Sequence, residues 1–240
     1  MTPQKEIEHV LKQTQISDPE YKTFREKTTK LTVLGHRLPV LQSIVKDGFS
    51  FYTKTSEEIL ATWNTIWQTS QIHEALTLPL LYYRQHLDVL DLAHWRVMKT
   101  WIDRIENWEH ADNVCSLYSV LYERFPKQIE PTLRTWNRSR NPWKQRASIV
   151  SLIYYATPKR KAPPVQLVLE LVEPLIPIRD KYVAKAVGWT LRESHKLYPN
   201  ETLEFLTKHI HELAPDSFSY ATEKLSKSQK DGLKLMRKSL

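Results

Sequence analysis

Cysteine is almost missing from this chain of 240 residues, which contains only Cys115. An internal disulfide and a cysteine-based zinc cluster are therefore excluded, and the composition fits a reducing compartment. Long hydrophobic runs are missing too, since no stretch approaches the roughly 20 apolar residues of a membrane span. The first residues, MTPQKEIEHV, lack the apolar region of a secretory signal. We therefore expect a folded cytoplasmic protein with no membrane partner.

Glycine is the second scarcity, with four residues in the whole chain. Four scattered glycines cannot form the glycine-rich loop that holds phosphate groups in nucleotide-binding proteins. The segment HIH, residues 209 to 211, places two histidines two positions apart on an expected helix. They do not share a helical face, so they make no metal site. We expect neither a cofactor nor a metal.

Positive charge is in excess, with 35 Lys and Arg against 27 Asp and Glu and a formal net charge of +8. Clustered cations favour a polyanionic partner, because their binding releases the counterions condensed on a phosphate backbone. Many basic proteins have no such partner, so charge alone leaves the partner open.

Helix-start signals recur along the sequence, and no segment has the pattern of a strand. Asp18 and Asn141 are each followed by proline, as at capped helix N-termini, and Thr55 begins a capping box, TSEE. Each signal is expected to open a helix of about 12 to 16 residues.

About a dozen such helices with short connectors predict an all-α fold. The regular alternation favours a HEAT-like repeat solenoid of antiparallel helix pairs, which we expect to form a single domain over residues 1–240. The stretch TPKRKAPP, residues 157 to 164, is expected to be a loop between two helices.

The segment DKYVAKAVGWTLRE, residues 180 to 193, combines aromatic rings and cations on one helical face. That face holds Tyr182, Lys185, Trp189, Arg192 and Lys196, while the packing side holds Val183, Ala186, Val187 and Thr190. Gly188 is unfavourable inside a helix and therefore indicates close approach by another backbone or by a ligand. The alternative for Trp189 is an amphipathic indole half covered by lysine stems.

The segment ENWEHADNVCSLYS, residues 106 to 119, places Trp108 and Asp112 four positions apart on one side of a helix. The expected core stripe of this helix is Val114, Leu117 and Leu121. Asp112 and Ser119 point away from that stripe, so Asp112 is either a functional carboxylate or an ordinary acid near a helix N-terminus. His110 is more typical of a surface or hydrogen-bonded histidine than of a base.

Two basic segments add candidate contacts. In NPWKQRASIV, residues 141 to 150, the guanidinium of Arg146 suits a phosphate oxygen, and the alternative is a solvated charge. The last segment, residues 223 to 240, is a basic helix that is either simply solvated or in contact with a nucleic-acid backbone.

Together these segments resemble the AlkD family of DNA alkylation repair glycosylases. The resemblance is carried by WEHAD, NPWKQRASIVSLIYY and DKYVAKAVGWTLRE followed by YP, in family order, and by LGHRLPVLQSIVK near the N-terminus. It extends from about residue 18 to residue 238. The chain departs from the family at Glu109, where better-known members have aspartate, and at Asn107, where they have tryptophan. These departures concern substrate range more than reaction type.

The resemblance implies a HEAT-like solenoid whose concave face holds double-stranded DNA and which cleaves the N-glycosidic bond of N3- or N7-alkylated purines. It implies that Trp108 and Trp189 face the deoxyribose, that Asp112 supports the developing charge and the attack of water, and that Arg146 holds the backbone. We expect a monomer without a cofactor. The expected DNA-binding residues are Arg146, Lys185, Arg192, Arg37, Lys144 and Tyr182.

Two other interpretations remain. One is a non-catalytic HEAT-like protein that binds branched or distorted DNA, against which the presence of both tryptophans and Asp112 speaks. The other is a protein-binding HEAT scaffold, which would use an apolar groove and would not need a basic face.

Overall fold

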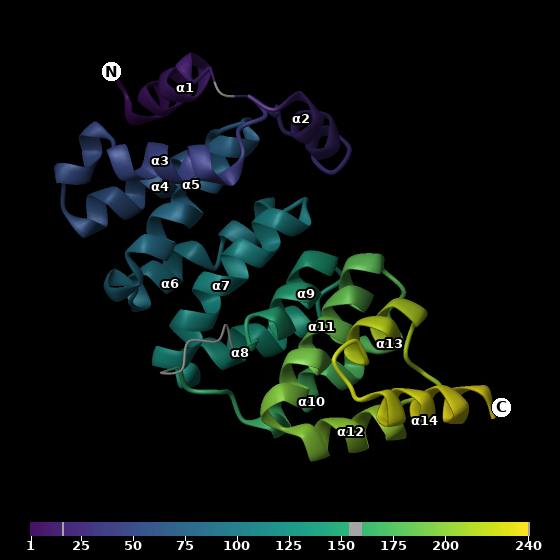
Figure 1. Ribbon diagram of the computed structural model, residues 1–240. Helices are drawn as coiled ribbons and strands as arrows, with labels where there is room; N and C mark the ends of the chain where they lie inside the picture. The colour runs from purple at the N-terminus through teal and green to yellow at the C-terminus, as the bar shows by residue number, and fades with distance from the viewer. Residues whose placement is uncertain (16, 154–159, 240) are drawn as a thin grey trace. The chain divides into compact units, whose positions relative to one another are not determined.

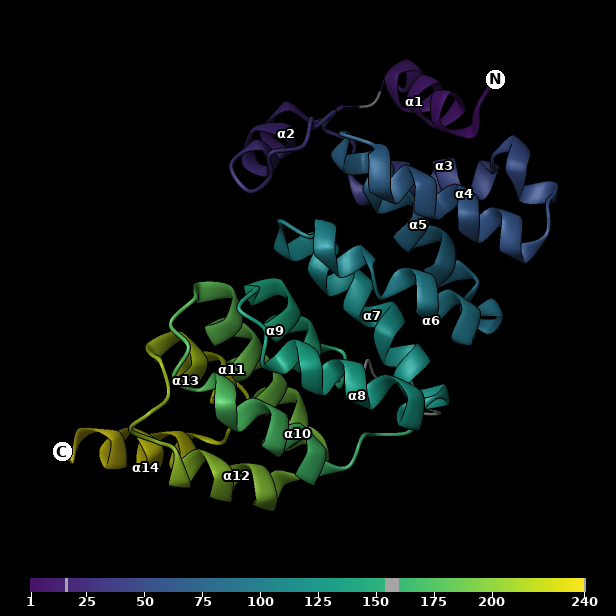
Figure 2. The same ribbon diagram turned by 180° about the vertical axis from the view of Figure 1, so that it is seen from behind.

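The computed structural model describes residues 1–15, 17–153 and 160–239 (Figures 1 and 2). These residues form fourteen α-helices and four short 3₁₀ helices. They contain no β-strand, only an isolated bridge between Thr32 and Ile72. The predicted all-α fold is confirmed. The chain divides into two compact units, residues 1–117 and 118–240. The expected single domain over residues 1–240 stays a prediction.

The first unit is built around α5, which packs against α1, α3 and α4. Its core contains enclosed indoles: the rings of Trp67 and Trp101 stack with centroids 4.8 Å apart, and Trp67 Nε1 donates to the carbonyl oxygen of Trp101 at 3.1 Å. The elements of this unit are α1 (Pro3–Gln13), α2 (Pro19–Glu26), α3 (Leu38–Asp47), η1 (Ser50–Thr53), α4 (Ser56–Thr69), α5 (His73–Gln85), η2 (Leu87–Val89), α6 (Leu92–Met98), η3 (Trp101–Arg104) and the first part of α7 (Trp108–Arg124).

The second unit is built around α11, which packs against α9, α10, α12 and α13. Figures 1 and 2 show α11 between α9 and α13. Besides the last part of α7, the elements are α8 (Pro126–Asn137), α9 (Pro142–Val150), α10 (Val165–Val172), η4 (Glu173–Leu175), α11 (Lys181–Leu197), α12 (Pro199–Lys208), α13 (Pro215–Ala221) and α14 (Lys227–Lys238).

The three predicted helix starts are confirmed. The side chains of Asp18 and Asn141 accept hydrogen bonds from the first turns of α2 and α9, and Thr55 forms a complete capping box with Glu58 at the start of α4. The predicted lengths are correct for α4, with 14 residues, but wrong for α2 and α9, with 8 and 9 residues. A cap therefore located where these helices begin and carried no information on where they end.

Three further expectations have different outcomes. Ser119 was expected to point away from the core, but it is buried and donates to the carbonyl oxygen of Ile153. The segment 209–211 was expected on a helix, but α12 ends at Lys208. Of the predicted loop 157–164, residues 157–159 lie outside the described residues, and residues 160–164 precede α10 without helical structure.

Gly188 lies where α11 crosses α13. A Cβ atom at this position would lie 2.5 Å from the carbonyl oxygen of Ser217 and 3.0 Å from its Cα. The Ser217 hydroxyl also donates to the carbonyl oxygen of Ala184 at 2.8 Å, which joins the two helices at this crossing. The predicted close approach of another backbone to Gly188 is thereby confirmed.

We expect Gly188→Ala to lower the free energy of unfolding by about 1–3 kcal/mol, because the added methyl group meets backbone atoms that cannot rotate away. Gly232→Ala in α14 is the matched control, since a Cβ built there meets no atom within 4 Å beyond its chain neighbours and the nearby backbone of its own helix. The control should leave stability unchanged or raise it by up to about 1 kcal/mol through helix propensity. Urea denaturation followed by circular dichroism measures both. Equal stability of Gly188→Ala and the native protein would contradict the close approach.

Candidate nucleic-acid interface

The first turn of α7 presents an indole to solvent. Asn107 caps this helix: its Oδ1 accepts from the His110 amide at 2.9 Å, and its carbonyl oxygen accepts from the Ala111 amide at 3.2 Å. Trp108 follows at the first helical position and is 36% exposed. Asp112, one turn later, is partly exposed. The predicted core stripe of α7 is confirmed, because Val114, Leu117 and Leu121 are fully buried.

A buried ion pair lies against this turn. Arg25 of α2 is 6% exposed, and its Nη2 lies 2.7 Å from Oε2 of Glu109. Its Cζ lies 4.9 Å from the ring centroid of Trp108 and 5.0 Å from that of Tyr21. Burial raises the pKa of the Glu109 carboxyl, while the Arg25 charge acts in the opposite direction. Burial also raises the pKa of the Tyr21 hydroxyl, and the Glu109 charge adds to that effect.

Two stacked histidines lie beside the same carboxylate. The rings of His73 and His110 are 4.4 Å apart, and Nε2 of His73 lies 3.5 Å from Glu109 Oε2. Burial lowers the pKa of His73 to about 4 and that of His110 well below its ordinary value. His110 Nε2 lies 3.1 Å from Thr77 Oγ1. The interpretation of His110 as a hydrogen-bonded histidine is confirmed.

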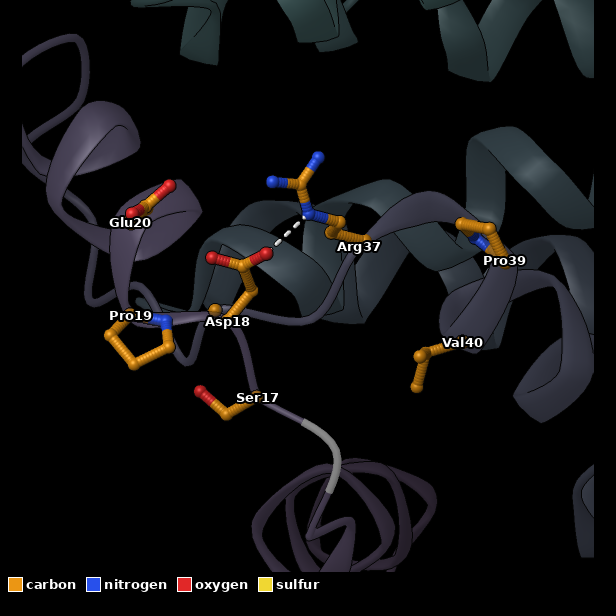
Figure 3. Close-up of a pocket in the computed structure, with 8 residues that line it drawn as sticks. Ser17, Asp18, Pro19, Glu20, Arg37, Pro39 and Val40 are labelled. Carbon is orange, nitrogen blue, oxygen red and sulfur yellow. Dashed lines mark hydrogen bonds and ion pairs between the residues drawn. The ribbon is translucent and has the colours of Figure 1, made fainter.

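Arg37 lies at the start of α3, beside an open hollow of about 770 Å³ (Figure 3). Its side chain is exposed and its Nε lies 2.6 Å from Oδ2 of Asp18. Gly35, two positions before Arg37, has a φ of 93°, and a Cβ there would lie 2.7 Å from Ser17 Oγ. The Gly35 amide donates to Glu74 at 2.8 Å, which fixes the backbone that presents Arg37.

In the second unit, Arg146 of α9 is placed against Trp189 of α11. Arg146 is 5% exposed, its Nη1 donates to the carbonyl oxygen of Tyr182 at 2.7 Å, and its Cζ lies 5.7 Å from the Trp189 ring centroid. The alternative of a solvated charge at Arg146 is therefore wrong. Trp189 itself is partly exposed. A cation over an indole in a poorly solvated position makes a favourable contact that fixes the ring.

The face of α11 follows the predicted pattern. The four residues of its packing side are buried, and those of the opposite face are partly or fully exposed. The Tyr182 ring lies 4.7 Å from that of Trp143, and Lys185 Nζ lies 5.9 Å from the Tyr220 ring centroid. Lys144, next to Trp143, is partly exposed. Aromatic rings and cations are thus interleaved along α9 and α11.

Arg192 is held by carboxylates of its own unit. Its Nη1 lies 2.5 Å from Glu223 and its Nη2 lies 3.0 Å from Glu193, which also pairs with Lys196 at 2.5 Å. Arg192 must therefore exchange these carboxylates for a phosphate before it can contact DNA. Helical periodicity does not predict these ion pairs.

The predicted site residues fall in both units. Arg37, Trp108 and Asp112 belong to the first unit, and the second unit contains Lys144, Arg146, Tyr182, Lys185, Trp189 and Arg192. The meeting of the two groups at one nucleotide stays a prediction. The sequence analysis did not identify Arg25 as a neighbour of Trp108. The unusual glutamate at position 109, which pairs with Arg25, was the feature of the sequence that pointed to this part of the site.

Within residues 1–15, 17–153 and 160–239, no group of three His, Cys, Asp or Glu side chains is arranged to hold a metal ion. None of the helices in the described part of the chain combines the length and the apolar character needed to cross a bilayer.

The sequence model of the family described as DNA alkylation repair enzyme matches residues 11–225. The chain belongs to this family. The match covers the capped start of α2, the exposed turn of α7 and the cationic aromatic face of α11. No curated protein matches the sequence of this family member.

Solved structures of similar fold include a predicted DNA alkylation repair enzyme from Enterococcus faecalis, with a TM-score of 0.73, 15% identity, and coverage of 88% of this chain and 97% of that one. The smu.31 protein of Streptococcus mutans UA159 has a TM-score of 0.56 and 15% identity, covering 99% and 98%. AlkD2 of Streptococcus mutans has a TM-score of 0.54 and 16% identity, covering 92% and 97%. At these identities the likeness establishes the helical-repeat fold.

Proposed function

We propose that this family member is a DNA glycosylase that releases N3- or N7-alkylated purines from double-stranded DNA, as the first step of base excision repair. The observation that carries the proposal is the turn at the start of α7, where Trp108 is 36% exposed and Asp112 follows one turn later. An exposed indole beside a carboxylate contributes little to a core. It suits a substrate that becomes cationic during the reaction.

The chemistry requires few groups from the protein. Alkylation at N3 or N7 makes the purine cationic and a good leaving group, so no strong general acid is needed. As the N-glycosidic bond breaks, positive charge develops on the sugar. In the proposal, ionised Asp112 stabilises that charge and orients the attacking water, and the faces of Trp108 and Trp189 line the sugar.

DNA binding is assigned to the cations and rings of the predicted set. Arg37 is exposed at the start of α3, and Lys185 is partly exposed on α11. In the proposal these two residues and Lys144 contact phosphates, while Arg146 fixes Trp189 and reaches the backbone of the adjacent nucleotide. Holding the lesion against the duplex, without a snug pocket for the base, would admit bulky adducts.

The test is release of methylated bases from duplex DNA treated with a methylating agent. We expect chromatography to detect 7-methylguanine or 3-methyladenine in excess of spontaneous depurination, with yield proportional to protein concentration. A Trp108→Ala, Trp189→Ala double variant that keeps the native circular dichroism spectrum is the control and should release far less. DNA binding without base release would instead support the non-catalytic alternative.

A further inference from the structure

The environment of Arg25 is unusual for an arginine. The side chain is enclosed by three rings, with Cζ 4.9 Å from the centroid of Trp108, 5.0 Å from Tyr21 and 5.5 Å from Phe24. Its Nε and Nη1 are buried and form no hydrogen bond with the described residues. Buried donors without partners are unfavourable, so packing alone does not explain an arginine here. Costly local arrangements of this kind concentrate at functional sites.

The second feature is the charge balance around this guanidinium. Glu109, with a side chain 15% exposed, lies 2.7 Å from Arg25 Nη2 and neutralises its charge. Tyr21 and His73 also lie close to Glu109, and Glu74 adds a second negative charge to its surroundings. Arg25 and Glu109 thus form an ion pair without net charge, and the flat guanidinium of that pair lies over the ring of an exposed indole.

We propose that Arg25 and Glu109 are positioning residues of the DNA site: Arg25 covers one face of Trp108 and leaves the other for the sugar, and Glu109 cancels the Arg25 charge. This inference rests on the proposed glycosylase function. Arg25 suits the task because a planar guanidinium stacks on a ring, whereas a lysine ammonium does not. The pair also accounts for glutamate at position 109, since its carboxylate is the one that reaches Arg25.

Neutralisation of the Arg25 charge by Glu109 matters because the sugar cation would form close to the guanidinium. A sugar on the open face of Trp108 would lie about 9 Å from the guanidinium of Arg25. This distance is the sum of the guanidinium–ring distance on one face of the indole and a similar ring–sugar distance on the other. At an effective dielectric constant of about 20, an uncompensated Arg25 would slow formation of a sugar cation by roughly 20-fold. Glu109→Gln is therefore expected to reduce the single-turnover rate by roughly 10- to 30-fold, while affinity for undamaged duplex stays equal or rises.

The position of Trp108 is tested by fluorescence. The emission of Trp108 is obtained by subtracting the emission of a Trp108→Phe variant from that of the same protein with Trp108 present. The subtraction is made once for the native protein and once for Arg25→Met. We expect Arg25→Met to raise acrylamide quenching of Trp108 roughly twofold, because a second ring face becomes open to solvent. Arg25→Lys should behave like Arg25→Met. Arg134→Met, which breaks an ion pair with Glu130 and Glu170 in the second unit, is the control and should leave Trp108 quenching unchanged.

The link to catalysis is tested by a double-mutant cycle. The variant Arg25→Met, Glu109→Gln removes the guanidinium without leaving an unpaired buried charge. It should reduce single-turnover base release roughly 10-fold in the native background and have no further effect in Trp108→Ala, because Arg25 acts through that indole.

Unchanged quenching of Trp108, or an equal loss of rate in the Trp108→Ala background, would overturn the inference. If the native protein releases no base, the proposed function fails, and the quenching result alone decides whether Arg25 positions Trp108.

Discussion

Asp112→Asn is expected to reduce the rate of base release from methylated duplex DNA by about 10²- to 10³-fold. The substitution keeps the size of the side chain and its place on α7, and it removes one negative charge. In the proposed mechanism that charge is the main electrostatic partner of the sugar cation, because the departing purine already carries its own positive charge. Single-turnover assays with protein in excess isolate this step from product release.

In Asp112→Asn, the affinity for DNA and the rate of base release are expected to change differently. Loss of a negative charge near DNA should leave affinity for undamaged duplex equal or higher, measured by fluorescence anisotropy. Asp216→Asn is the matched control, since Asp216 is an exposed acid in the first turn of α13. Base release by the control should equal that of the native protein. A rate for Asp112→Asn within a factor of two of the native rate would remove Asp112 from the mechanism.

The parts of the structure that the sequence predicted well are those determined within a few residues of chain. Asp18, Thr55 and Asn141 cap helices because each cap side chain lies only two or three positions before the backbone amides that donate to it. Helical periodicity likewise assigned the buried side of α11, including the contact at Gly188. A glycine inside a strong helical pattern was informative because it is locally unfavourable.

The parts that the sequence did not predict depend on residues far apart in the chain. Arg25 and Glu109 belong to different helices far apart in the sequence, and no local pattern marks their pairing. Arg192 meets Glu223 through the packing of α13 on α11. Ser119 lies off the apolar stripe of its helix and is nevertheless buried, with its hydroxyl donating to the carbonyl oxygen of Ile153. Charge and periodicity identify candidate cations, and only packing decides which of them are already neutralised.

The response of DNA binding to salt depends on how many cations contact phosphates and on how many are already paired with carboxylates. The slope of the logarithm of affinity for undamaged duplex against the logarithm of salt concentration is about −4.5 if all five predicted cations, Arg37, Lys144, Arg146, Lys185 and Arg192, each contact one phosphate. This is the steepest value expected, because Arg37 and Arg192 are already paired with carboxylates. Between about 50 and 200 mM salt the affinity then falls roughly 500-fold. Anisotropy titrations over this range measure the slope. A flat response would contradict a phosphate-contacting surface and would favour a protein-binding scaffold.

Single substitutions resolve which cations contribute. Lys185→Met should make the slope less steep by about 1, because one released counterion is lost. Arg134→Met is the control and should leave it unchanged, since Arg134 is paired with Glu130 and Glu170 at 2.8 and 2.6 Å. Arg192→Met should change the slope less than Lys185→Met, because Arg192 must first leave Glu193 and Glu223. A full unit of change at Arg192 would mean that DNA displaces both carboxylates and that the ion pairs around Arg192 belong to the free protein alone.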